Sequence, residues 1–204
     1  MLAVSGTAAA QQASSTGFYV GADVGQSKLG SFDFGDQEAF ATRDDTDTSF
    51  RFNVGYRFSE YVALETGVAD FGSFDTEVAM VCIAIVGVDC THRVSTSMDG
   101  AFVNAIGTWP LGRHVYLSAA VGAFYYRADT RVALDTTATP ARTRDSGTAA
   151  QYGVGAGFPV NDRFTITLDW QRVEDTSIHP WPVSPTLRHD ADLTTLTAGV
   201  RFSF

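Results

Sequence analysis

Alternation of apolar and polar residues with a period of two is the feature that most constrains how this chain folds. From Phe50 to Phe58, apolar side chains stand at every second position and are separated by Arg51, Asn53, Gly55 and Arg57. Because successive side chains of a β-strand point to opposite faces, this pattern predicts a strand with one apolar and one polar face. The same division recurs in residues 18–25 and 196–204, and helical periodicity is almost absent. The pattern therefore predicts an all-β fold.

Eight strands of this kind are predicted along the chain, at 17–29, 48–59, 61–72, 98–109, 114–127, 148–160, 163–174 and 192–204. Short turns at 59–60, 110–113 and 161–162 alternate strictly with long polar connections at 30–47, 73–97, 128–147 and 175–191. In an up-and-down barrel, this alternation places every short turn at one rim and every long loop at the other. The prediction is an eight-stranded antiparallel up-and-down transmembrane β-barrel with three short periplasmic turns and four long extracellular loops, as in the bacterial outer membrane.

Composition excludes two other classes of protein. The net charge is −9 and Lys28 is the only lysine, so we expect no basic stripe that would bind a nucleic acid. The longest nearly uninterrupted apolar stretch, residues 78–88, is well short of the roughly 18 to 20 residues of a membrane-spanning helix.

Glycine indicates which face of the predicted barrel points inward. Glycine weakens a strand, so a water-facing surface has no reason to concentrate it, whereas the narrow lumen of an eight-stranded barrel does. We therefore predict a lumen of glycine, alanine and a few charges, inside a lipid-facing apolar band. Nine glycines share the polar face: Gly21, Gly25, Gly55, Gly67, Gly122, Gly153, Gly155, Gly157 and Gly199. Aromatic residues near the strand ends are expected to form two interfacial girdles: Phe18, Tyr56, Phe58, Trp109, Tyr125, Phe158, Phe164, Trp170 and Phe202.

The inward face also carries ionisable residues, and two interpretations of them stay open. A buried charge must be paired or hydrated, so these groups form either a structural network that fills the lumen or a small ion-conducting path. The predicted set is Asp23, Arg51, Arg57, Glu65, Asp169 and Arg201.

The last strand and two inner segments carry a family resemblance. Residues 197–204, with Gly199, Phe202 and a terminal Phe204, resemble the C-terminal signal that the barrel assembly machinery reads in outer-membrane proteins. Residues 52–67 and 125–130 resemble the transmembrane domain of outer membrane protein A, and the similarity extends over 17–204. The resemblance implies a monomer surrounded by outer-membrane lipids and lipopolysaccharide. In that family, acidic and basic residues gate a narrow lumen. Glu65 matches one of the acids. Ile106 and Thr167 stand at the two basic positions and Gly157 at the second acidic one, so the resemblance does not imply the same gate in this chain.

The N-terminus and the cysteines suggest export. Residues 1–10, with Ala8 and Ala10, are interpreted as a signal-peptide remnant, with a plain small-residue tail as the alternative, and 11–204 as one barrel domain. Cys82 and Cys90 enclose seven residues, so a local disulfide is predicted, and two unpaired thiols are the alternative. No zinc site and no cofactor are expected.

The sequence favours a non-enzymatic structural or surface-interaction role, performed by extracellular loops that bind a ligand. A narrow pore is the first alternative and a lipid A-modifying enzyme the second, although none of the four histidines lies in a His-x-Ser motif. In the loops, the acidic segment 30–47 is either a cation site or simply solvated. The apolar segment 81–88 either forms a contact surface or leans on the barrel rim or the lipid, and Trp181 is an anchor for either a partner or the lipid interface.

Overall fold

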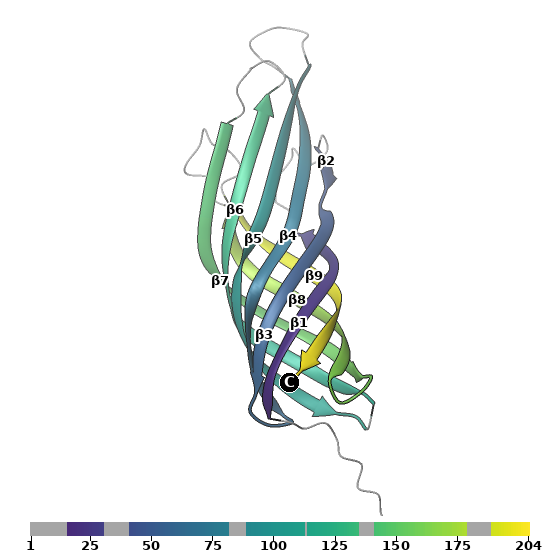
Figure 1. Cartoon of the computed structure of the whole chain (residues 1–204). Coiled ribbons are helices and arrows are strands. Elements are labelled where there is room, and N and C mark those ends of the chain that lie inside the picture. The colour runs from purple at the N-terminus through teal and green to yellow at the C-terminus, as the bar shows by residue number, and fades with distance from the viewer. Residues whose placement is uncertain (1–15, 31–40, 82–88, 113, 135–140, 179–188) are drawn as a thin grey trace, which may run out of the picture.

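The computed structural model describes residues 16–30, 41–81, 89–112, 114–134, 141–178 and 189–204, which form one antiparallel sheet closed into a barrel (Figure 1). Its strands are β1 (Gly17–Leu29), β2 (Ala41–Asp44), β3 (Thr46–Arg57), β4 (Val62–Val81), β5 (Asp89–Pro110), β6 (Tyr116–Leu134), β7 (Ala141–Pro159), β8 (Phe164–Ile178) and β9 (His189–Ser203). Only Asp45 separates β2 from β3, and both pair with β4, so together they occupy one of eight positions around the barrel. Pairing of β4 with β5 closes the sheet, and the predicted eight-stranded fold is confirmed.

Four strands are much longer than the sequence predicted, and β8 and β9 are longer by a few residues. β4 to β7 contain 20, 22, 19 and 19 residues, so most of the predicted loops 73–97 and 128–147 is paired strand. These segments escaped detection because, where side chains are described, their outer face is mostly polar, for example Ser97, Asp129 and Arg142, which weakens the apolar alternation. In Figure 1 they stand as a tall wall above the ends of β1, β8 and β9. We call the strand residues 73–81, 89–99, 127–134 and 141–148 the wall.

The outer surface of the barrel is apolar, with exposed fractions of 61% for Phe52 and 64% for Val121. Towards the wall, this apolar band ends at one level. The next outward residues on the eight strand positions are polar: Gln26, Thr48, Asp70, Asp99, Arg127, Thr148, Arg172 and Thr194. The described residues contain no helix with the length and apolarity needed to cross a membrane.

The lumen has two layers, and the expectation that small and charged residues alone fill it is wrong. Near the wall, large side chains including Phe71, Met98, Phe102 and Phe124 form a buried apolar cluster, which we call the apolar plug. Glycines of neighbouring strands make room for these rings. A Cβ atom added at Gly67 would lie 2.8 Å from Phe102 Cζ, closer than side chains tolerate. The layer nearer the short turns is mainly polar and also contains a small apolar cluster of Tyr19, Ala63 and Ile106.

Candidate functional site

Strand register brings the predicted ionisable residues together inside the barrel. Asp23 of β1 lies opposite Arg51 of β3 on one side and opposite Gly199 of β9 on the other. All the residues concerned occupy alternate, inward positions of their strands, so their side chains meet in the lumen. We call the group the lumen network: Tyr19, Asp23, Arg51, Asn53, Glu65, Thr167, Asp169 and Arg201.

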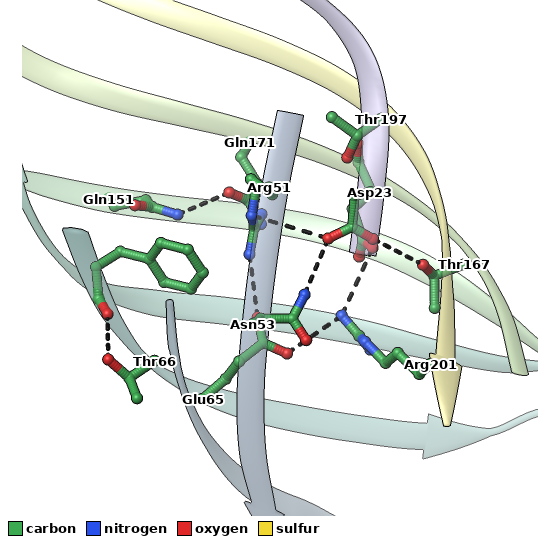
Figure 2. Close-up of polar contacts among 12 residues, drawn as sticks. Asp23, Arg51, Asn53, Glu65, Thr66, Gln151, Thr167, Gln171, Thr197 and Arg201 are labelled. Atoms are coloured by element: carbon green, nitrogen blue, oxygen red, sulfur yellow. Dashed lines mark hydrogen bonds and ion pairs between the residues drawn. The ribbon is translucent and has the colours of Figure 1, made fainter. Parts of the chain in front are cut away.

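Glu65 is the centre of the lumen network (Figure 2). Its Oε1 accepts a hydrogen bond from Arg51 Nη2 at 3.0 Å, and its Oε2 lies 3.5 Å from Arg201 Nη2. The Tyr19 hydroxyl donates to the same Oε2 at 3.0 Å. Arg201 Nη2 also lies 3.6 Å from Asp169 Oδ2, so one guanidinium bridges two carboxylates of different strands. The glutamate is 1% exposed, and its contacts tie β1, β3, β4 and β9 together.

Asp23 forms the second half of the network. Asn53 Nδ2 donates to its Oδ2 at 3.0 Å, and Thr167 Oγ1 donates to its Oδ1 at 3.3 Å. Arg51 Nε lies 4.0 Å from the same carboxylate. Gly199 leaves the space that this carboxylate occupies, since an added Cβ would collide with Asp23 Oδ1. Gly199 of β9, although it weakens its own strand, therefore makes room for a buried acid of the neighbouring strand β1.

Five of the six predicted ionisable residues share this network, and one does not. Arg57 is half-buried nearer the short-turn rim, with its Cζ atom 5.9 Å from the centroid of the Tyr19 ring. The sequence analysis considered only ionisable residues and so missed the neutral members Tyr19, Asn53 and Thr167. Their inward positions in the alternating pattern could have predicted that they belong to the network. A separate buried pair, Gln151 Nε2 to Gln171 Oε1 at 2.7 Å, extends the polar layer (Figure 2).

The polar layer and the apolar plug meet at Arg51, so buried side chains fill the lumen on both sides of it. The Arg51 guanidinium lies over the ring of Phe102, with Cζ 4.4 Å from its centroid, which is the geometry of a cation–π contact. A small gap beside the network, lined by Glu65, Asp169 and Arg201 among others, measures about 10 Å³. Such a gap holds about one water molecule.

The predicted aromatic residues point outward from the barrel. Phe18, Phe58, Trp109, Tyr125, Phe158 and Phe164 are exposed, and Tyr56 and Trp170 are half-exposed. Several form edge-to-face or tilted pairs, for example Phe18 with Tyr56 at 4.9 Å between centroids. At the chain end, Phe202 packs on both Phe164 and Phe204, each at 5.1 Å. Their roles as membrane girdle and assembly signal stay predictions.

Other predicted features lie partly or wholly outside the described residues. Cys82 is one of these, so the disulfide with Cys90, whose backbone belongs to β5, stays a prediction. Residues 1–10, 31–40 and 82–88 and Trp181 are also outside. Within the described ranges, no group of three or more histidine, cysteine or acidic side chains is placed to hold a metal ion.

A closed eight-stranded barrel with an apolar exterior and a lumen filled by side chains defines a class of protein, the small membrane-spanning β-barrel. The chain belongs to the family described as the outer membrane protein beta-barrel domain, whose model matches residues 1–204. The protein is thus a β-barrel of the bacterial outer membrane, and the short-turn rim is the periplasmic one.

Solved structures agree with this fold at low sequence identity. OprG from Pseudomonas aeruginosa superposes with a TM-score of 0.60 at 12% identity, over 94% of this chain and 98% of that one. Neisserial surface protein A gives 0.52 at 17% identity, over 93% and 98%. AlkL, solved in lipid bilayers, gives 0.51 at 15% identity, over 94% and 92%. A search of curated proteins finds no match.

Proposed function

We propose that this protein is a closed, non-enzymatic scaffold of the outer membrane that displays an interaction surface on its extracellular side. The observation that carries this proposal is the packing of buried side chains in the lumen. The charged groups there contact one another, with Arg51 and Glu65 only 2% and 1% exposed, and the apolar plug covers them towards the wall. Neither a conducting path nor a substrate site is favoured by groups that are already engaged with each other.

The wall supports the proposal that the protein displays an interaction surface on its extracellular side. β4 to β7 continue beyond the apolar band as paired strands, so they hold a surface in place outside the membrane without relying on loops alone. Along Ala141–Ala149, β7 pairs with β6, whereas its pairing with β8 begins only at Ala150 among the described residues. A rigid sheet surface is suited to recognition because little conformational entropy is lost when a partner binds.

Single-channel recording in planar lipid bilayers tests the closed lumen. We expect the purified wild-type protein to give at most small and infrequent openings. Phe124→Ala, which shortens a side chain that is 0% exposed in the apolar plug, should increase the frequency of openings. As a matched control, Val121→Ala shortens an exposed residue of the same strand and should leave the recordings unchanged. A stable, large conductance of the wild-type protein would overturn the proposal.

A narrow pore is the second candidate, and the gap of about 10 Å³ beside Glu65 and Arg201 is the observation that favours it. If this gap belongs to a conducting path, Glu65→Gln should change the ion selectivity of the small openings. If the openings come from occasional disorder of the plug, their selectivity should not respond to this substitution. Measuring reversal potentials in a salt gradient distinguishes the two cases.

A further inference from the structure

Arginine side chains gather on one part of the outer surface, although the protein as a whole has a net charge of −9. Arg127 and Arg131 lie on β6, and Arg142 and Arg144 lie on β7. Register pairs Arg131 with Arg142, and it pairs Asp129 with Arg144. The alternate residues of β6 between them are buried inside the wall, so all four arginines face outward. We call these four residues the arginine patch.

A single carboxylate organises the arginine patch. Arg142 Nε donates to Asp129 Oδ1 at 2.6 Å, and its Nη2 donates to Oδ2. Arg144 Nε donates to Oδ2 at 3.2 Å, and Arg131 Nε lies 3.8 Å from Oδ1. Each guanidinium has five N–H donors, and one carboxylate accepts only a few of them. Three arginines around one aspartate therefore keep both excess positive charge and unused donors.

The patch is open to a ligand. The side chains of Arg131, Arg142 and Arg144 are 64%, 46% and 72% exposed. Arg127 lies opposite Asp99 of β5 in the register, so the excess positive charge is concentrated on the other three arginines. Two other basic residues of the outer surface, by contrast, are matched by acids. Lys28 pairs with Asp45, and Arg172 contacts both Glu174 and Asp192.

The position of the patch indicates what kind of ligand it meets. Arg127 is two residues beyond Tyr125, the last large apolar residue on the outer face of β6, and Arg131 is six residues beyond it. At roughly 3.3 Å per residue, the patch covers a distance of about 7 to 20 Å along the strand above the apolar band. It faces sideways, over the lipid, rather than upward. The groups beside it are therefore the headgroups of lipids in the outer leaflet.

We propose that the arginine patch binds the phosphorylated saccharide headgroup of lipopolysaccharide in the outer leaflet. A planar guanidinium group can donate two parallel hydrogen bonds to the oxygens of one phosphate or carboxylate group. The acyl chains of the same lipid molecule would lie along the apolar face below Tyr125. A soluble polyanion would gain only the charge contacts and none of the apolar ones. The proposal rests on the outer-surface role proposed above and names the ligand class for it.

Binding of fluorescent lipopolysaccharide to the full-length, refolded protein in detergent micelles tests the proposal. The variant Arg142→Ser/Arg144→Ser should bind at least 10-fold more weakly than the wild type, and raising the salt concentration should reduce this difference. Arg163→Ser, which removes an exposed arginine at the periplasmic rim, is the matched control and should bind like the wild type. Heat-modified migration in gel electrophoresis establishes that each variant is folded.

Two further probes identify the source of the anionic groups. Lipopolysaccharide with its phosphates removed should bind wild-type protein about as weakly as the double variant binds the intact lipid. Equal binding of both lipids, or wild-type affinity of the double variant, would overturn the proposal. Heparin, a soluble polyanion, should bind more weakly than lipopolysaccharide, and the reverse order would also overturn it. None of these outcomes concerns lumen occlusion, which bilayer recording tests separately.

Discussion

Two clusters of arginine and carboxylate groups in this protein use the same chemistry in opposite surroundings. In the lumen network, two arginines face three carboxylates, and the side chains of Arg51 and Arg201 are 2% and 8% exposed. In the arginine patch, three arginines surround Asp129, and their side chains are 46% to 72% exposed. Burial requires that each charge has a partner inside the protein, whereas water tolerates an excess. The closed cluster thus holds the barrel together, and the open one is available to a ligand.

Removal of the central carboxylate of the lumen network should have the largest effect. Glu65→Ala leaves Arg51 and Arg201 buried without their common partner, which typically costs about 3–5 kcal/mol of folding stability. Urea unfolding of the protein in lipid vesicles, followed by tryptophan fluorescence, measures this loss. Glu65→Gln keeps the volume and some hydrogen bonds, and we expect a smaller loss. An alanine variant as stable as wild type would show that the lumen network does not stabilise the barrel.

The junction between the polar layer and the apolar plug should show an intermediate effect. Phe102→Leu removes the ring over the Arg51 guanidinium but keeps an apolar side chain, so we expect a loss of about 1–2 kcal/mol. The same unfolding measurement applies. Val103→Leu, on the neighbouring outward position, is the control for a change of shape on β5 and should be nearly neutral. Equal losses for both variants would argue against a specific contribution from the contact with Arg51.

The equivalent change in the arginine patch should have the smallest effect. Asp129→Asn removes the carboxylate that three arginines share, but exposed ion pairs contribute little, so stability at neutral pH should change by an amount near the measurement error. Lipopolysaccharide affinity should not fall, because the substitution makes the patch more positive. A large loss of stability would show that the patch is a structural element, as the lumen network is.

Low pH sharpens the contrast at Asp129, which lies outside the membrane-spanning segment. Hydrogen bonds from Arg142 and then from Arg144 lower the pKa of Asp129 to about 2, against about 3.9 in an unfolded chain. Because the pKa is lower in the folded state, the contribution to stability is present above about pH 4 and is lost as the pH falls towards 2. This contribution is too small to follow by unfolding, so the Asp129 carboxylate is followed by NMR as the pH is lowered, and its midpoint should lie near pH 2. A midpoint near 3.9 would contradict the assigned pairing.

Sequence alternation predicted the lumen network better than it predicted the arginine patch. Asp23, Glu65 and Asp169 were assigned inward because the apolar residues beside them fix which face of each strand points to the lipid. Arg57 was assigned to the same set, but its strand position lies nearer the periplasmic rim, out of reach of the others. Which residues meet depends on the height of each residue in the barrel, and register between strands sets that height.

The arginine patch was missed because residues 128–147 were interpreted as a polar loop. Arg131 and Arg142 are eleven positions apart in the chain and become direct neighbours only when β6 pairs with β7. The low basic content of the whole sequence argued only against a stripe that would bind a nucleic acid. It gave no signal for a local cluster of arginines, since an average over the chain carries no information about how pairing distributes charge.

The sequence by itself determined that this chain forms an eight-stranded barrel with an apolar exterior, because a period of two assigns every strand residue to one of two faces. Tertiary structure alone decided how far β4 to β7 extend, where large aromatic side chains close the lumen and which charges meet. The physical reason is that the face to which a side chain points is a local property of its strand. The register between strands, the height of a residue in the barrel and its packing depend instead on neighbours that are distant in the chain.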